Sequence, residues 1–373
     1  MTKYNAENER VKRRYFTFLK EAKQRSEASI DPIAKALNRF ETYTKFKSFK
    51  VYHFQQAIGF KKHLAQQMSV RTDEPLSKAT AYSTLAALKA FFQWLCREPG
   101  FKHLSYSGAD YFSLSLKDTA IARAGKEERV PTLEQIRRVI FAMPFETDIE
   151  KRNRALIAFI MMTGARVDAA ASIRLKHVNL DEGKVFQDAK QVRTKYSKSF
   201  TTYFFAVGAD IHAIFSDWVT FLQKERLWSL DDPLFPATRM GLGASGQFEP
   251  AGLDRKCWAN TSPIRKIFRE AFEAVGLPYF NPHSFRSTLA LHGERTCQTF
   301  EDLKAWSQNL AHKSLMTTLC SYGQVEERRQ AEIIRSLGRE KPSGDDQEAL
   351  ARKIAELLSS HKGGDASQAR AET

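Results

Sequence analysis

The sequence predicts a mainly α-helical protein with a small antiparallel β-sheet, in which an N-terminal helical bundle precedes a larger, mostly helical domain. Apolar residues recur at helical spacing through the first part of the chain. A polar, charged segment follows at 118–130 and is typical of an exposed linker. Beyond it, 184–207 is rich in Val, Phe, Tyr and Thr around a polar centre, which favours two or three short antiparallel strands.

Four helices are predicted in the N-terminal third. The strongest pattern lies at 77–96, where Ser77 follows Pro75 as a candidate N-cap and the helix ends before Pro99. Its apolar face carries Ala81, Leu85, Leu88, Phe92 and Leu95. The other three amphipathic segments span 6–27, 32–46 and 52–68. Together they predict a small bundle.

The second domain opens with a helix that Thr132 can cap and that carries Ile136, Val139 and Ile140. An apolar helix is expected at 153–164 with Gly164 as its stop, another from Ser262 to Gly276, and a last one at 346–358. We therefore place an N-terminal domain at 1–120, a linker at 121–130, the second domain at 131–340 and a partly disordered or docking tail at 341–373.

Positive charge is concentrated in the first third of the chain. The whole sequence of 373 residues has a net charge of +15. Residues 1–130 hold 24 Lys and Arg against 13 Asp and Glu, a net charge of +11. Such a surplus is typical of a surface that binds a polyanion, because each neutralised phosphate releases counterions. Charge alone does not separate DNA from RNA or anionic lipid.

Several classes of protein are excluded by composition. The longest apolar run, 155–162, is far shorter than the ~20 residues that span a bilayer. The polar N-terminus has no apolar signal sequence. The four cysteines lie far apart with no C-x-x-C pair, which argues against a disulfide framework or a zinc ribbon and favours the cytoplasm.

One motif match is dismissed. Residues 241–246 spell G-x-G-x-x-G, but no strand leads directly into them and no apolar helix follows. We expect a flexible loop there. The chain also lacks G-x-x-x-x-G-K-[ST], so nothing supports chemistry driven by ATP.

Four short segments place cationic or proton-transferring groups in order along the second domain, followed by a tyrosine. They are Thr163-Gly164-Ala165-Arg166, Thr194-Lys195-Tyr196-Ser197-Lys198, Asn281-Pro282-His283-Ser284-Phe285-Arg286 and Leu310-Ala311-His312-Lys313-Ser314, and Tyr322 comes ten residues after His312. Each residue alone has an ordinary structural explanation, such as a surface ion pair or an aromatic at the edge of a core.

This ordered set resembles the tyrosine recombinases, the phage-integrase type of site-specific DNA recombinase. Residues 153–180 resemble the first conserved box of that family, and H-x-x-R with the later His and Tyr resembles the second. The helix at 83–98 resembles the last helix of the N-terminal DNA-binding bundle. The resemblance implies a SAM-like core-binding domain and a catalytic domain that form a C-shaped clamp around duplex DNA.

The resemblance also implies a role for each residue. Arg166 and Arg286 would hold the non-bridging oxygens of the scissile phosphate. Tyr322 would attack phosphorus and form a 3′-phosphotyrosyl link, with His283 as proton acceptor and His312 as a hydrogen-bond partner of the phosphate. Lys195 would protonate the departing 5′-oxygen. No cofactor and no metal ion are implied.

Some positions stay open or depart from the family. Lys190 and Lys198 flank Lys195 in the same hairpin; we prefer Lys195 because it precedes the polar turn. His177 and His292 match no family position and are interpreted as structural or solvent-facing. The family commonly has an acidic residue three positions after the first arginine, where this chain has Ala169; Asp168 is one residue early. Ala206 replaces a frequent proline, and the spacing from His312 to Tyr322 is one residue longer than in many members.

The expected partners are double-stranded DNA recombination sites and three further copies of the chain in a homotetramer, with accessory DNA-bending proteins as optional partners and no membrane. We expect a cytoplasmic, nucleoid-associated protein of a prokaryote. Two alternatives stay open at this point: a DNA-binding relative without cleavage activity, and a hairpin resolvase or type IB topoisomerase that uses the same chemistry.

Overall fold

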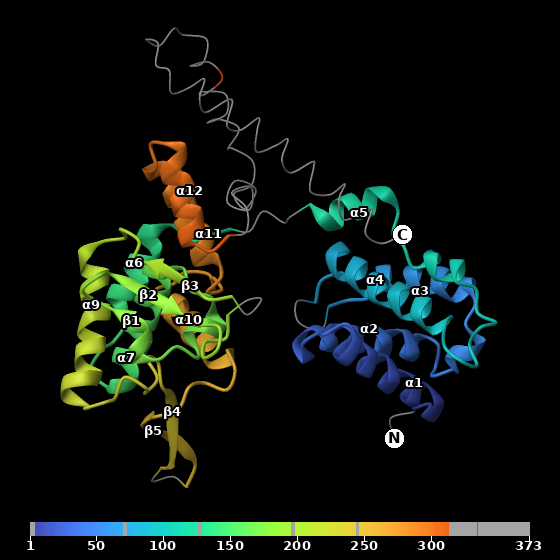
Figure 1. The fold of residues 1–373 in the computed structure, drawn as a ribbon, viewed down its shortest axis with the longest axis horizontal. Helices are drawn as coiled ribbons and strands as arrows, with labels where there is room; N and C mark the ends of the chain where they lie inside the picture. Colours follow the sequence, from blue (N-terminus) through green and yellow to red (C-terminus); the bar gives the residue numbers. More distant parts are fainter. Residues whose placement is uncertain are drawn as a thin grey trace. The chain divides into compact units, whose positions relative to one another are not determined.

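The computed structural model describes residues 4–69, 73–124, 129–194, 198–243, 246–312 and 334. The chain divides into two compact units, Met1–Glu127 and Glu128–Thr373. Both are mainly helical in their described parts, and the second also carries two small antiparallel sheets (Figure 1). The predicted fold class is confirmed.

The first unit is built from short helices. In order they are α1 (Ala6–Thr17), the π-helical η1 (Phe18–Ala22), α2 (Glu27–Tyr43), η2 (Phe49–Val51), α3 (Phe54–Gln66), α4 (Lys78–Leu95), η3 (Ser107–Tyr111) and α5 (Leu116–Arg123). All four predicted helices are present, and Ser77 caps α4 by accepting a hydrogen bond from the backbone N–H of Thr80 at 3.2 Å. Part of the segment expected as a linker forms α5 instead, with Ser115 as its N-cap.

Aromatic rings dominate the core of the first unit. Phe92 on α4 is fully buried, and its ring contacts those of Phe40, Tyr52 and Phe112 at centroid distances of 5.5, 4.0 and 5.4 Å. Edge-to-face and stacked pairs of this kind add to the stability gained by burying apolar area. This core belongs to the first unit alone.

The second unit has nine named helical segments in its described part. They are α6 (Leu133–Ala142), α7 (Asp148–Thr163), α8 (Val167–Ala170), η4 (Leu175–His177), α9 (Ala209–Thr220), η6 (Phe221–Glu225), α10 (Ser262–Ala274), α11 (Ser284–Thr296) and α12 (Phe300–Asn309). Thr132 caps α6 as predicted, in a capping box with Gln135. Pro263 stands in the first turn of α10, where its missing N–H is tolerated.

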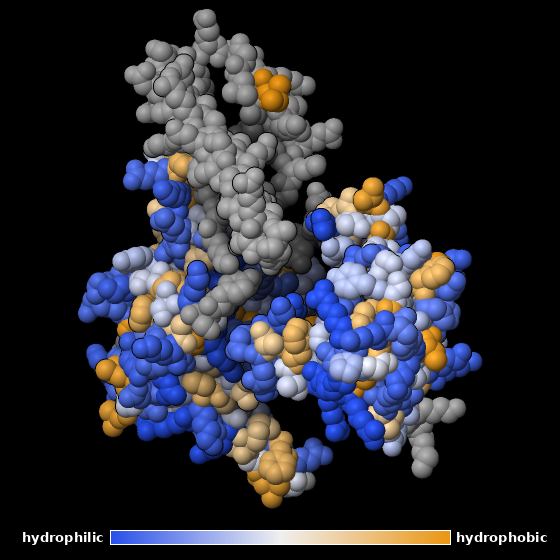
Figure 2. All heavy atoms as spheres, turned by 45° about the vertical axis from the view of Figure 1, so that its right-hand side comes forward, coloured by the Kyte–Doolittle hydropathy of each residue, from blue (hydrophilic) through white to orange (hydrophobic). Residues whose placement is uncertain are grey.

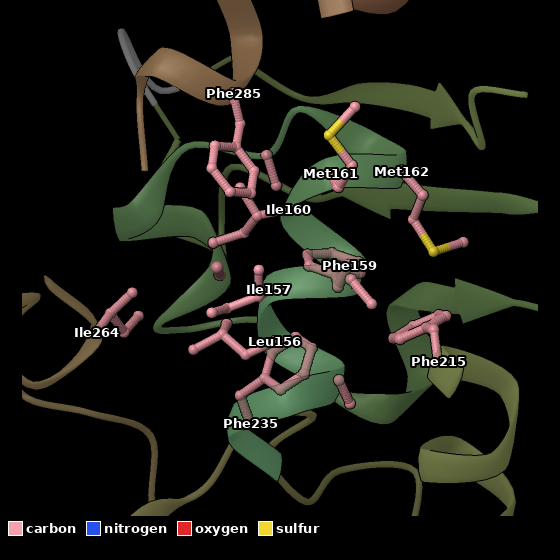
Figure 3. Packing of buried hydrophobic residues seen from close by; sticks show 14 of the residues in the cluster. Leu156, Ile157, Phe159, Ile160, Met161, Met162, Phe215, Phe235, Ile264 and Phe285 are labelled. Atoms are coloured by element: carbon pink, nitrogen blue, oxygen red, sulfur yellow. The ribbon is translucent and has the colours of Figure 1, made fainter. Parts of the chain in front are cut away.

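Helix α7 is the centre of the second core. Every side chain from Ala155 to Met162 is fully buried. Figure 3 shows that Leu156, Ile157, Phe159 and Ile160 extend from the helix among Phe215, Phe235, Ile264 and Phe285 of surrounding elements. A helix that is apolar on all sides is stable only inside a core. The helix ends at Gly164, which adopts a left-handed conformation with φ +58° as its C-cap. The core therefore fixes the point at which the chain leaves α7 for Arg166.

The first sheet has three strands in the order β1 (Val178–Asn179), β2 (Lys184–Gln187) and β3 (Phe200–Tyr203), all antiparallel. In the β2–β3 hairpin, Val185 pairs with Thr202 and Gln187 with Phe200. The predicted strands in 184–207 are thus present. The loop that joins them carries the predicted lysine.

The second sheet corrects part of the prediction of a flexible loop at 241–246. Strands β4 (Ala237–Leu242) and β5 (Phe248–Asp254) form an antiparallel hairpin, and β4 includes the first two residues of the glycine motif, whereas Gly243 and Gly246 lie outside the strands. Gly241 lets the strands approach, since a Cβ there would lie 2.9 Å from the Cβ of Ala251. Glycine and proline interrupt the alternation of apolar and polar residues that is typical of a strand, so the sequence did not predict this hairpin. Its end carries exposed apolar side chains, at the bottom of Figure 2.

The C-terminal segment is described only at Ile334, which is helical and exposed. The helix predicted at 346–358 and the tail predicted at 341–373 lie outside the described residues. None of the described helices has the length and apolar character needed to cross a membrane.

Candidate active site

Arg166 follows a tight turn at the end of α7. Gly164 makes this turn in close contact with other segments: a Cβ on it would lie 2.9 Å from Leu310 Cδ2 and 3.1 Å from Leu289 Cδ1. Arg166 itself is half-buried and is the N-cap residue of α8, whose Ala170 N–H donates to the Arg166 carbonyl at 3.0 Å. The turn therefore places Arg166 beside residues of α11 and the segment after α12.

Arg286 joins three of the predicted segments. It lies in the first turn of α11 with 5% of its surface exposed. Its Nη1 donates a hydrogen bond to the carbonyl of Gly164, and its Nη2 donates to the carbonyl of Leu310. These acceptors stand two residues before Arg166 and two residues before His312. One buried guanidinium thus links the first box, the H-x-x-R motif and the segment of the second histidine.

A local turn orients His283. Asn281 Oδ1 accepts hydrogen bonds from the backbone N–H groups of His283 and Ser284 at 2.9 and 3.2 Å, and Ser284 Oγ donates to the Asn281 carbonyl at 2.7 Å. Such an Asx turn is a strong local constraint on the chain that enters a helix. His283 is exposed, whereas Arg286 one turn later points inward.

His312 lies in a strongly positive environment. Its backbone N–H donates to the Ser307 carbonyl at 3.2 Å, just beyond the end of α12. The pKa of His312 is lowered to about 4, mainly because the imidazole is buried and in addition because Arg286, Arg166 and His283 lie near it. The ring is therefore neutral at pH 7, with one nitrogen as donor and the other as acceptor. Because these three neighbours all act on one ring, the four residues form a single cluster, called here the cationic cluster after its two arginines.

Two of the six predicted residues, Lys195 and Tyr322, lie outside the described residues, and their roles stay predictions. The loop that leads to Lys195 is described as far as Thr194. Asp188 forms two hydrogen bonds that make a turn at the start of this loop. The Asp188 carbonyl accepts from Val192 N–H at 2.7 Å, and Asp188 Oδ1 accepts from Lys190 N–H at 2.9 Å. Ser199 Oγ accepts from Ala189 N–H at 2.9 Å and holds the two sides of the loop together.

The other residues considered from sequence lie at separate places. His177 is buried and its Nδ1 accepts a hydrogen bond from the Arg174 backbone N–H at 3.0 Å, while its Nε2 has no hydrogen-bond partner in the described part of the chain. His292 packs edge-on against the ring of Trp306. Asp168 is exposed and Ala169 buried.

The Asn309 side chain forms a contact that the sequence analysis did not predict. Its Oδ1 accepts from Tyr203 N–H at 2.7 Å and its Nδ2 donates to the Tyr203 carbonyl at 2.9 Å, so the side chain pairs with strand β3 as a neighbouring strand would. Asn309 is three residues before His312. It therefore ties the β2–β3 hairpin to the segment of the second histidine, and no sequence pattern marks a side chain that binds backbone atoms.

Comparison with protein families gives two matches. The sequence model of the "Phage integrase family" matches residues 130–329, and that of "Phage integrase, N-terminal SAM-like domain" matches residues 13–99. The first contains Arg166, His283, Arg286 and His312, together with Lys195 and Tyr322.

Curated relatives and solved structures point the same way. The chain is 23% identical over 308 residues to a protein named tyrosine recombinase XerC from Halalkalibacterium halodurans, covering 82% of this chain and 89% of that protein. A second protein of that name, from Corynebacterium glutamicum, is 23% identical over 68% of this chain and 71% of its own length. The fold matches a lambda integrase dimer bound to a COC′ core site with a TM-score of 0.55 and 14% identity, covering 90% of this chain and 98% of that one. It also matches XerH site-specific recombinase bound to a palindromic difH substrate, with a TM-score of 0.54 and 19% identity over 87% and 83% of the two chains.

Proposed function

The chain belongs to the phage integrase family of tyrosine recombinases, and from this membership we propose the reaction and the residue roles that follow. It is a site-specific recombinase, an enzyme that transfers DNA strands. We assign the cleavage chemistry to the cationic cluster of Arg166, His283, Arg286 and His312, with Lys195 and Tyr322 completing it. The observation that carries the proposal is the Arg286 side chain, which joins the segments of Arg166 and His312.

The cluster suits a phosphodiester that gains negative charge as it is attacked. A guanidinium has five N–H donors, so Arg286 can hold a phosphate oxygen in addition to the two carbonyls it contacts. Arg166 would hold a second oxygen from the opposite segment. Donors fixed by a folded core need no reorganisation during the reaction, and this is the main source of electrostatic catalysis.

In the proposed cleavage step, one bond to phosphorus forms as another breaks. The phenol oxygen of Tyr322 forms a bond to phosphorus while the bond from phosphorus to the 5′-oxygen breaks. His283 takes the phenol proton, and Lys195 gives a proton to the 5′-oxygen, which leaves as a hydroxyl. Neutral His312 donates one hydrogen bond to a phosphate oxygen.

Resealing follows the same path in reverse. The 5′-hydroxyl of a second strand attacks phosphorus and gives its proton back to Lys195, while the bond from phosphorus to Tyr322 breaks and the phenol oxygen recovers its proton from His283. The covalent link to the protein retains the energy of the phosphodiester, so no ATP is required.

The partner is DNA, and we also propose how many copies of the protein assemble on it. Exchange between two duplexes requires four strand cleavages, and one protomer supplies one tyrosine. We therefore propose a homotetramer on two sites, with accessory bending proteins as optional partners. The named relatives are bacterial proteins, and on that basis we propose that the enzyme acts at the nucleoid in the cytoplasm of a prokaryote.

Covalent trapping tests the reaction. A duplex nicked close to the cleavage site loses a short fragment on cleavage, so the protein stays attached to the DNA. Wild type should form an adduct that survives denaturing electrophoresis, and Tyr322→Phe should form none. An adduct of undiminished yield with Tyr322→Phe would refute the assignment of the nucleophile, and a wild type without adduct on its own site would favour a relative that only binds DNA.

A second assay separates recombination from relaxation. A supercoiled plasmid with two cognate sites should give products with exchanged flanking segments. Relaxed plasmid without exchanged segments would favour a topoisomerase instead.

A further inference from the structure

Arg193 lies in the loop between β2 and β3, the loop that contains Lys195 in the sequence, and it forms three hydrogen bonds to residues outside this loop. Its Nη1 donates to the Ala259 carbonyl at 2.9 Å and its Nη2 donates to the Trp258 carbonyl at 2.8 Å. Its backbone N–H donates to Ser172 Oγ at 2.9 Å. Arg193 is two residues before Lys195, so these contacts fix the chain immediately before the predicted proton donor.

The groups that hold Arg193 are themselves well fixed. Ser172 Oγ donates to the Asp168 carbonyl at 2.9 Å, which connects the loop to α8, the helix whose N-cap residue is Arg166. Trp258 is 4% exposed, and the buried guanidinium of Arg152 lies over its ring at 5.0 Å from the centroid. The loop is thus attached to the segment of Arg166 through hydrogen bonds and packed side chains.

Val192 attaches the same loop to the hydrophobic core of the second unit. It is 2% exposed and belongs to the core of the second unit. A lysine side chain is long and flexible, so the position of its ammonium depends on where the backbone starts. A misplacement of about 1 Å at a reacting group can cost about 100-fold in rate.

We propose that Arg193 is a positioning residue for proton donation: it fixes the chain at 192–194, immediately before Lys195, relative to the segment of Arg166. This inference rests on the proposed function. The Arg193 guanidinium donates to the carbonyls of Trp258 and Ala259, and the experiment below separates this positioning role from a direct contact with the DNA.

The chemistry of the leaving group offers a specific test. An oxygen leaving group needs a proton as its bond to phosphorus breaks, whereas a thiol with a pKa near 8.5 leaves readily as the thiolate. A DNA substrate with sulfur in place of the bridging 5′-oxygen therefore makes proton donation unnecessary. A variant impaired only in proton donation regains its rate on this substrate, and a variant impaired in phosphate binding does not.

We would measure single-turnover adduct formation on nicked duplexes with bridging oxygen or bridging sulfur, at saturating protein. The proteins are wild type, Lys195→Ala, Arg193→Gln, Arg193→Lys and Arg138→Gln. The last is a matched control, because Arg138 on α6 is also exposed and its guanidinium also donates to a backbone carbonyl, that of Val275 at 3.2 Å.

Arg193→Gln should lower the rate on the oxygen substrate about 10- to 100-fold, as loss of a supporting group at a site typically does. On the sulfur substrate it should come within about threefold of wild type, as Lys195→Ala does. Arg193→Lys can reach only one carbonyl and should be intermediate, and Arg138→Gln should match wild type on both substrates.

Three results would overturn the proposal. The first is that sulfur rescues Lys195→Ala but not Arg193→Gln. The second is that Arg193→Lys matches wild type, which would show that only the charge matters. The third is that Arg193→Gln keeps its single-turnover rate and only binds DNA more weakly. A wild type without adduct on either substrate would instead refute the proposed function.

Discussion

The protonation of His312 depends on its neighbours, and this gives the protein a specific response to acid. Its pKa in the folded protein is about 4, below the ordinary value near 6.5. The unfolded chain therefore binds more protons than the folded one between these values. The free energy of unfolding should fall as pH decreases from about 6.5 to 4, and the contribution is fully present only above that range.

Urea unfolding between pH 7 and pH 4 checks this expectation. Wild type should lose more stability over the interval than His312→Gln, which cannot take up the proton. Parallel curves for the two proteins would show that the ring is not held in the positive cluster.

Ala311 carries backbone strain next to the same ring. Its φ is +52°, a conformation that costs a residue with a Cβ roughly 1 kcal/mol. Ala311→Gly should therefore raise the free energy of unfolding by less than about 1 kcal/mol, because the entropy that glycine adds to the unfolded chain offsets part of the relieved strain.

Ala305→Gly is a suitable control for Ala311→Gly. Ala305 is exposed within α12. Glycine there should lower stability by about 1 kcal/mol. Equal losses for both variants, measured by urea unfolding, would contradict the strain at Ala311.

Among the elements, those with local signals were predictable. Ser77 and Thr132 cap the helices assigned to them, and Gly164 ends α7, because caps depend on residues within one turn. The β4–β5 hairpin was not predictable, since its pairing brings together residues whose alternation is broken by Gly241 and Pro250. For the cationic cluster, the sequence predicted which residues belong to it but not the contacts that hold them together.

The contacts that assemble the cluster could not be read from the sequence. Arg286, Arg193 and Asn309 bind main-chain atoms of residues far away in the chain. Every residue offers a carbonyl, so such an acceptor leaves no signature in the sequence. Lys195 and Tyr322 remain predictions from the family resemblance.

The pairing of Asn309 with β3 should stabilise α12 against the sheet. Asn309→Ala removes the bonds to Tyr203 N–H and carbonyl and leaves both groups of this strand to water. We expect a loss of about 1–2 kcal/mol in the free energy of unfolding, since each bond contributes about 1 kcal/mol. Hydrogen exchange should show faster exchange at Tyr203 and its neighbours, and unchanged protection of the Tyr203 amide would argue against the pairing.

At the scale of the whole molecule, two separate cores predict two unfolding transitions. The first unit has its aromatic core around Phe92, and the second has its core around α7. Phe92→Ala should destabilise the first unit by about 3–5 kcal/mol, the usual cost of removing a buried ring. The stability of the second unit should be unaffected.

Calorimetry with site-specific fluorescent labels in each unit measures this. The transition reported from the first unit should shift to lower temperature in Phe92→Ala while the other keeps its midpoint. A common shift of both transitions would show that the units unfold as one.

The bond from Arg286 to the carbonyl of Leu310 has a consequence for how this protein tolerates mutation. The peptide group at position 310 is present whichever amino acid occupies it, so substitutions there change packing but leave the acceptor in place. Neighbouring positions can vary in the same way as long as the path of the chain is kept. A pocket assembled through the main chain can therefore drift widely in sequence while its electrostatic character stays the same.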